Sequence, residues 1–211
     1  MKILSHRGYW KTPAEENTVI AFERSFSNGF GTETDIRDYK GELVISHDIA
    51  DEKNILLESF FEIYKGFDNE LLIALNIKAD GLQIKIKKLL EQYKIIDYFV
   101  FDMSIPDGLQ YLKYNIKSFT RQSEYEKEPS FYESAIGVWL DEFQSRWIDK
   151  KTIGFHIKNN KKICIASPDL HKREHIKEWE RFKQIEKELG INNLIICTDY
   201  PEVARRFFDD I

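Results

Sequence analysis

The sequence is poor in features that mark several classes of protein. It has only 2 cysteines, Cys164 and Cys197. Both lie inside apolar runs, so we expect buried free thiols and no disulfide. No segment approaches the roughly 20 apolar residues that a membrane span requires. The opening residues, MKILSHRG, lack the apolar core of a signal peptide. We therefore expect a cytoplasmic protein with no membrane span.

Neither sign of charge dominates the composition. The chain has 31 basic and 36 acidic residues and a formal charge of -5. This balance does not favour a nucleic-acid partner. No linker rich in Pro, Gly or Ser interrupts the 211 residues, so we expect one domain over residues 1–211. The sequence does not indicate an oligomeric state.

Short apolar runs alternate with amphipathic segments along the whole chain. Apolar side chains recur at helical spacing after the first run, at Val19, Phe22 and Phe26, and again between Ile176 and Leu189. The runs themselves read as strands. We expect strands at 2–6, 32–37, 71–77, 98–104, 116–121, 135–143, 161–167 and 193–199, with a short extended piece at 43–46.

Eight strand-helix units predict an α/β protein with a parallel sheet. Closed on itself, such a sheet is a (β/α)8 TIM barrel, which normally takes ~200 to 250 residues. An open doubly wound sheet is the alternative. The first strand-to-helix turn of this sequence lacks the Gly-rich phosphate-binding loop that such open sheets often have. We therefore expect the closed barrel, with its functional residues at the carboxyl ends of the strands.

The segment GTETDIRDYKGELVISHD, residues 31–48, gathers polar side chains at such a strand end. Glu33 and Asp35 are two apart on a predicted strand and therefore face the same side. A turn at Lys40 and Gly41 then returns the chain to His47. Two carboxylates among oxygen-bearing neighbours suit a hard divalent cation such as Mg²⁺ or Ca²⁺.

Histidines and cations complete the predicted site. His6 and His47 can act as proton acceptor and donor near neutral pH. Arg7 and Lys78 carry positive charge that suits an anionic substrate. A metal ion, an acid-base pair and two cations together indicate cleavage of a small phosphodiester.

Ordered motifs from the first strand to the last resemble those of the glycerophosphodiester phosphodiesterase family. They are SHRG at 5–8, EENTVIAFERSFSNG at 15–29, ETD at 33–35, HD at 47–48 and TDYP at 198–201. The resemblance implies a barrel that hydrolyses phosphodiesters with a divalent metal. It also implies residue roles: His6 and His47 as the acid-base pair, Glu33 and Asp35 as metal ligands, and Arg7 and Lys78 as phosphate-binding residues.

The sequence departs from the family pattern at two places. The family usually has a third metal ligand, a glutamate, two residues before the strand lysine, where this chain has Asn76. An amide oxygen can bind Mg²⁺ or Ca²⁺ but is neutral, so we expect lower metal affinity, with Asp102 as an alternative ligand. The family also has an insertion after the His-Asp pair. Here the segment between Asp48 and the next strand is short, which predicts a more open mouth.

Several residues have a simpler structural interpretation. We expect Asn17 to cap the first helix and to steady the loop near the site, and Asp199 to cap the last helix. We expect His156, His171 and His175 to lie on a solvated surface. Two other functions stay open. One is a non-catalytic barrel that binds a phosphorylated ligand. The other is a phosphodiesterase for nucleotide-, lipid- or polysaccharide-linked diesters.

Overall fold

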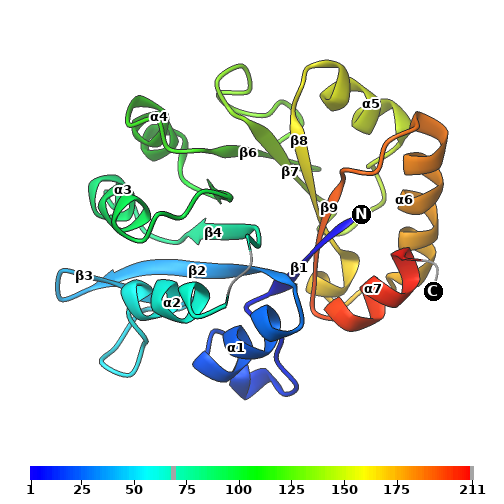
Figure 1. Ribbon diagram of the computed structural model, residues 1–211. Helices are drawn as coiled ribbons and strands as arrows, with labels where there is room; N and C mark the ends of the chain where they lie inside the picture. Colours follow the sequence, from blue (N-terminus) through cyan, green and yellow to red (C-terminus); the bar gives the residue numbers. More distant parts are fainter. Residues whose placement is uncertain (68–69, 210–211) are drawn as a thin grey trace.

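The computed structural model describes residues 1–67 and 70–209. Eight parallel strands follow one another in the order β5-β4-β2-β1-β9-β8-β7-β6 around a barrel (Figure 1). The fold confirms the predicted TIM barrel in a single domain, although positions 68, 69, 210 and 211 of the expected 1–211 range lie outside the described residues. The strands are β1 (Lys2–His6), β2 (Gly31–Tyr39), β4 (Ile73–Ile77), β5 (Tyr98–Phe101), β6 (Phe119–Ser123), β7 (Gly137–Asp141), β8 (Lys162–Ala166) and β9 (Ile195–Thr198). The extended piece after β2 is strand β3 (Glu42–Ile45), which pairs with β2 in antiparallel orientation.

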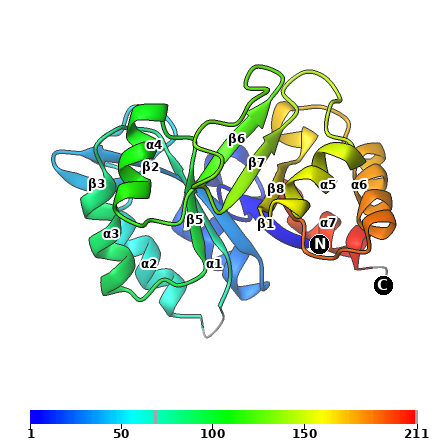
Figure 2. The same cartoon turned by 90° about the horizontal axis from the view of Figure 1, so that it is seen from above.

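Helices surround the barrel. Helices α2, α3 and α4 lie on one side of the barrel and α5 and α6 on the other (Figures 1 and 2). The helices are α1 (Val19–Ser27), α2 (Leu57–Lys65), α3 (Gln83–Gln92), α4 (Ile105–Lys113), α5 (Lys150–Lys158), α6 (Ile176–Leu189) and α7 (Pro201–Phe208), with 3-10 turns η1 (Pro13–Glu15) and η2 (Pro168–His171). The connection between β6 and β7, residues 124–136, is fully described and contains no helix.

The barrel closes between β5 and β6, where the strand boundaries differ most from those expected. Strand β5 stops at Phe101, three residues early, because Asp102 has a left-handed backbone with φ 71°. A single parallel bridge between Val100 and Ser118 joins the two strands. Strand β6 begins after that bridge, at Phe119, so the strand expected at 116–121 is shifted toward the carboxyl end.

Three apolar clusters stabilise the fold. Two of them pack helices against the outer face of the barrel. The third is built from the strands themselves, with side chains of matching register, and fills the interior. Cys164 and Cys197 belong to this interior cluster and are free thiols, as predicted. Its fully or nearly buried members are Leu4, Leu72, Ala74, Phe99, Phe101, Phe119, Trp139, Cys164, Ala166, Ile195 and Cys197.

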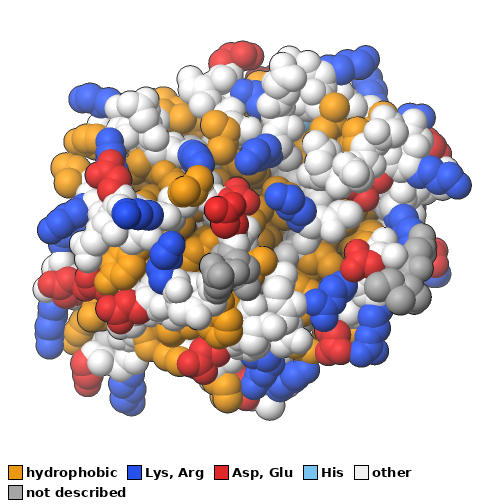
Figure 3. Space-filling view, viewed as in Figure 1, with side chains coloured by type: hydrophobic (Ala, Val, Ile, Leu, Met, Phe, Trp, Pro, Cys, Tyr) orange, Lys and Arg blue, Asp and Glu red, His pale blue; other side chains and the backbone are white. Residues whose placement is uncertain are grey.

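The surface shows the mixed charge that the composition indicates. On the face shown in Figure 3, Lys and Arg side chains alternate with Asp and Glu side chains and form no extended area of one sign. No helix in the part of the chain that the structure describes has the length and apolar character that a bilayer crossing requires.

Glycine at the start of β7 gives a test of interior packing. A Cβ atom at Gly137 would lie 2.4 Å from the Phe119 ring and 2.7 Å from the backbone oxygen of Lys162. We expect Gly137→Ala to lower the free energy of unfolding by about 2 kcal/mol, because the packed ring has little room to move. Urea unfolding followed by circular dichroism measures this.

Gly154 on helix α5 is the matched control. A Cβ atom there would come no closer than 3.7 Å to Leu189. Gly154→Ala is therefore expected to raise the free energy of unfolding by about 0.5 to 1 kcal/mol. Equal effects of the two substitutions would contradict the packing described for the interior.

Candidate active site

The carboxyl ends of three neighbouring strands bring the predicted residues together. His6 on β1 is aligned with Glu33 on β2, and Asp35 on β2 is aligned with Asn76 on β4. Glu33 and Asp35 lie two apart on one strand and therefore face the barrel interior together. The sequence prediction that these side chains converge is consistent with this register.

The two carboxylates are almost completely buried, each with 1% of its residue surface exposed. Asp35 is surrounded by donors and cations. Its Oδ2 accepts a hydrogen bond from Asn17 Nδ2 at 2.8 Å and lies 3.1 Å from Arg7 Nε. Its Oδ1 lies 3.6 Å from Lys78 Nζ. Both predicted phosphate-binding cations are thus held next to the predicted metal ligands.

Arg7 reaches this position through an unusual backbone conformation. Arg7 has φ 54° and Gly8 has φ 81°, so the chain turns sharply at the end of β1. Gly8 also packs against helix α1, where a Cβ atom would lie 2.8 Å from Ala21 Cβ, so only glycine fits. The turn lets the backbone N–H of Arg7 donate to Glu33 Oε2 at 3.2 Å, while its guanidinium pairs with Glu16 at 2.6 Å.

His6 is oriented by a carboxylate from the last strand. Its Nδ1 lies 2.7 Å from Asp199 Oδ1, and its Nε2 lies 3.9 Å from Glu33 Oε2. Burial lowers the pKa of His6, but the hydrogen bond to Asp199 and the charges of Glu33 and Asp199 outweigh it, so the pKa is raised above its usual value. His6 is therefore more easily protonated than a free imidazole.

Asp199 was expected to cap the last helix, and this expectation is wrong. The N-cap of α7 is Tyr200, and Asp199 turns toward His6. A second buried carboxylate, Asp169, fixes the Asp199 backbone by accepting its N–H at 2.8 Å, and it also accepts the Thr198 hydroxyl at 2.9 Å. Nothing in the sequence marks Asp169, which comes from the turn after β8.

Asn17 does not cap α1, contrary to expectation, but it does steady the loop near the site, as expected. The N-cap residue of α1 is Thr18, and Asn17 has φ 56°. Its side-chain oxygen accepts the Thr34 hydroxyl at 2.8 Å, while its amide donates to Asp35. Asn17 thus ties the loop before α1 to β2 and orients one of the carboxylates.

His47 lies at the rim of the barrel and is far more exposed than His6. Its side chain is 46% exposed, and its Nδ1 lies 2.9 Å from Asp48 Oδ1. The β2-β3 hairpin places it near the carboxylates, since the backbone N–H of Ser46 donates to Asp35 O at 3.0 Å. Arg37 donates to His47 O at 3.1 Å and holds the turn.

The donor set at the end of β2 and β4 fits a divalent cation in part. Burial, with the charge of Asp35, raises the pKa of Glu33 to about 7, so a nearby positive charge would stabilise its ionised form. Asp35 Oδ1 and Asn76 Oδ1 accept no hydrogen bond from any residue that the structure describes. Two carboxylates and a neutral amide oxygen are ligands that Mg²⁺ and Ca²⁺ accept.

A third carboxylate is not available at the same point. Both oxygens of Asp102 are engaged, one with Lys78 Nζ at 3.4 Å and one with Arg121. Among residues 1–67 and 70–209, no group of three or more His, Cys, Asp or Glu side chains is arranged to hold a metal ion. Asn76 is therefore the better placed third oxygen of the two that the sequence offered.

The other three histidines do not lie on a fully solvated surface, contrary to expectation. His175 is half-buried and stacked on Tyr200. His156 is 1% exposed and bonded to Tyr132, and burial lowers its pKa to about 4. His171 is partly buried, with Nε2 at 2.6 Å from Asp141 Oδ1. All three were misjudged because the Lys- and Glu-rich sequence around them gives no sign of a long-range partner.

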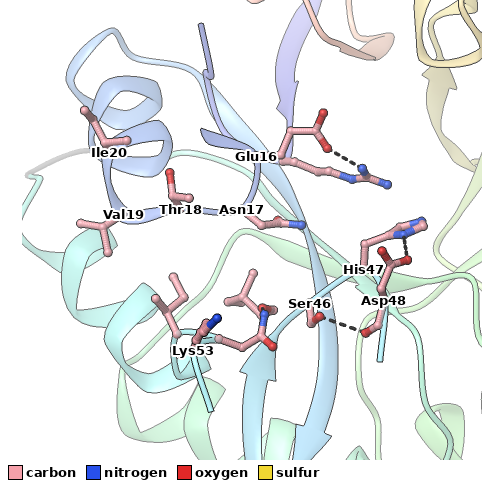
Figure 4. A pocket seen from close by; sticks show the side chains of 13 residues that line it. Glu16, Asn17, Thr18, Val19, Ile20, Ser46, His47, Asp48 and Lys53 are labelled. Carbon is pink, nitrogen blue, oxygen red and sulfur yellow. Dashed lines mark hydrogen bonds and ion pairs between the residues drawn. The ribbon is translucent and has the colours of Figure 1, made fainter. Parts of the chain in front are cut away.

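A pocket of about 630 Å³ opens beside the candidate site, between the start of α1 and the loop after β3. Arg7 and His47 both line it. Figure 4 shows Glu16 and His47 on one side of the pocket and Val19 and Ile20 on the opposite side. The site therefore has space for more than a phosphate group on this side.

Several solved structures have a similar fold. A provisional glycerophosphodiester phosphodiesterase of Galdieria sulphuraria superposes with a TM-score of 0.80 at 20% identity, covering 99% of this chain and 97% of that one. A glycerophosphodiester phosphodiesterase of Agrobacterium tumefaciens gives 0.68 at 15% identity, covering 100% of both chains. A Ca²⁺-dependent phosphatidylinositol-specific phospholipase C of Streptomyces antibioticus gives 0.59 at 8% identity, covering 98% of this chain and 95% of that one.

These similarities agree with the family that the sequence motifs resemble, and at such low identity they show the barrel fold. No protein-family model and no curated protein sequence matches the chain.

The buried Glu33 gives a test of the site's electrostatics. Its pKa of about 7 lies above the usual 4.5, so the folded protein holds this proton more tightly than the unfolded chain. Stability should therefore fall as pH rises between those two values. We expect Glu33→Gln to remove this loss, so that its stability relative to wild type increases by about 1 to 3 kcal/mol between pH 5 and pH 8.

Urea unfolding in excess chelator at the two pH values measures the difference. Glu180→Gln, which removes the same charge from the exposed face of α6, is the control and should show no such pH dependence. The same pH dependence in both variants would contradict the burial penalty at Glu33.

Proposed function

We propose that the chain is a phosphodiester hydrolase that acts on glycerophosphodiester-like substrates. The observation that carries this proposal is the His6–Asp199 pair at 2.7 Å, placed at one end of the barrel beside two buried carboxylates and two cations. Active sites of TIM barrels occupy this end. The family motifs and the names of the similar structures support the same reaction.

His6 and His47 act as the acid-base pair in this proposal. Asp199 holds Nδ1 of His6, which leaves Nε2 directed toward Glu33 and the site. The raised pKa of His6 suits it to donate a proton to the leaving oxygen. His47 is then the base that accepts the proton of the nucleophile. The nucleophile is either water or a hydroxyl next to the phosphate.

Arg7 and Lys78 bind the phosphate. Both now neutralise Asp35, and Lys78 also contacts Asp102. Each cation therefore has a pairing that a phosphate oxygen can replace without moving the side chain far. Charge-assisted hydrogen bonds of this kind are stronger than neutral ones.

Glu33, Asp35 and Asn76 would hold a divalent cation, Mg²⁺ or Ca²⁺. Such an ion supplies Lewis-acid stabilisation of charge on the phosphate oxygens. The protein would hold the side-chain oxygens of Glu33, Asp35 and Asn76 close to the ion and exclude water from around them. Asp35 Oδ1 and Asn76 Oδ1 are buried and accept no hydrogen bond from the described residues, which supports this assignment. The two buried free thiols support a reducing compartment such as the cytoplasm.

Purified protein tested against a panel of phosphodiesters decides whether the barrel is catalytic. We expect hydrolysis of glycerophosphodiesters that excess chelator abolishes and that Mg²⁺ or Ca²⁺ restores. His6→Ala and His47→Ala should each lower kcat by about two to four orders of magnitude. The double variant should lose much less than the product of the two, because the pair works as a unit.

His175→Ala, a half-buried histidine stacked on Tyr200, controls for the loss of an imidazole elsewhere and should keep wild-type turnover. Binding of a phosphodiester with no turnover under any metal condition would instead favour the non-catalytic barrel. Full turnover in excess chelator would contradict the proposed dependence on a divalent metal.

Replacing Asn76 tests the third ligand. Asn76→Glu adds a negative charge where the family has one, so we expect Mg²⁺ affinity without substrate to rise at least about tenfold. Titration calorimetry measures it directly. Asn192→Glu, at an exposed position before β9, adds the same charge to the protein elsewhere and should leave the affinity unchanged. Equal affinities in both variants would exclude Asn76 from the metal's ligands.

A further inference from the structure

The side of the barrel mouth next to Asp102 and Arg121 has little room for a substrate's substituents. Around Asp102 and Arg121 the cavity is only about 20 Å³, because Arg121 forms ion pairs with both Asp102 and Glu126 there. The pocket of about 630 Å³ beside Arg7 and His47 is more than an order of magnitude larger. A group attached to a phosphate held by Arg7 therefore has space on this side.

The pocket lining changes in character from its inner to its outer end. Arg7 and His47, with their partners Glu16 and Asp48, line the end where the phosphate would lie. Asn17 and Ser46 follow as neutral polar groups near the middle (Figure 4). This order matches a phosphate followed by a polyol linker.

The outer end is aliphatic. Val19 and Ile20, in the first turn of α1, line it and remain 39% and 51% exposed, and Ile55 lies on the opposite loop. Ile49, which directly follows Asp48, is 92% exposed. Lys53 also lines this end, and the stem of a lysine can pack along a hydrocarbon while its ammonium stays in water. Apolar side chains gathered beside a catalytic cleft commonly mark a binding surface.

We propose that this groove binds the hydrocarbon chain of a singly acylated glycerophosphodiester, a lysophospholipid. The inference rests on the proposed phosphodiesterase function and names its substrate class. The phosphate occupies the Arg7 end, the glycerol lies beside Asn17 and Ser46, and the chain lies along Val19 and Ile20. The short loop after Asp48 leaves the groove open to solvent along its length.

Chain length is the variable that tests the groove. The substrates are glycerophosphocholine and its 1-acyl derivatives from butanoyl to decanoyl, used below their micelle-forming concentrations. Each methylene that the groove covers should raise kcat/KM by about two- to fourfold. We expect the decanoyl compound to exceed glycerophosphocholine by at least about tenfold.

A pair of matched variants assigns the effect to the groove. Ile20 and Ile84 are both the second residue of a helix, α1 and α3, and are 51% and 64% exposed. Ile20→Asp should lower the ratio of decanoyl to glycerophosphocholine kcat/KM about tenfold, whereas Ile84→Asp should keep the wild-type ratio. Their circular dichroism and thermal unfolding show that both variants are folded.

The same compounds, titrated calorimetrically in excess chelator, separate this inference from the proposed function. Turnover that does not depend on chain length would contradict the proposed acyl-chain groove but would still support the proposed phosphodiesterase function. Affinity that rises with chain length and is lost in Ile20→Asp, without turnover of any diester, supports the groove and overturns the function. Chain-length dependence that appears only above the micelle-forming concentration, or that Ile84→Asp loses equally, also overturns the groove.

Discussion

Two buried carboxylates on one face of β2 dominate the organisation of this end of the molecule. Burying a negative charge is costly unless positive charge or hydrogen bonds compensate it. Glu33 and Asp35 are placed together by strand periodicity alone, and each is nearly inaccessible to water. The left-handed turn at Arg7, the inward Lys78 and the side chain of Asn17 all supply that compensation to Asp35, whereas burial raises the pKa of Glu33 to about 7. The arrangement is favourable only in this barrel, where three separate segments reach one point.

The buried carboxylates also give the two histidines different surroundings. His6 lies among charged neighbours and is fixed by Asp199, which a further carboxylate, Asp169, holds from behind. His47 stands at the rim beside the exposed Asp48 and keeps contact with solvent. One imidazole is therefore held in a fixed orientation and has a raised pKa, and the other remains in contact with solvent. The acid and base roles that we propose for these two side chains would need such an asymmetry of surroundings.

Local patterns in the sequence predicted most of the fold, and long-range contacts account for what they did not predict. The eight strands and the convergence of Glu33, Asp35 and Asn76 follow from periodicity and from where apolar runs end. The roles of Asn17 and Asp199 were mistaken for helix caps, because a polar residue before a helix looks the same whether it bonds to the helix or to a distant strand. Asp169 and the partners of His156 and His171 lie 24 to 34 residues along the chain from the groups they bind. Spacing along a chain carries no information about such pairs.

The way the barrel closes makes one part of the protein sensitive to salt concentration. Strands β5 and β6 meet through one backbone bridge, Val100 with Ser118, whereas the β1-β2 and β6-β7 neighbours share ladders. Near the mouth the same seam is crossed by the ion pair of Asp102 and Arg121, both partly exposed. Attraction between such charges weakens as dissolved ions screen it, with a Debye length of about 10 Å at 0.1 M salt. A rise in ionic strength should therefore weaken the β5-β6 contact more than the strand pairs that are joined by continuous ladders. Because Asp102 also pairs with Lys78, the same rise should weaken the electrostatic restraint on Lys78.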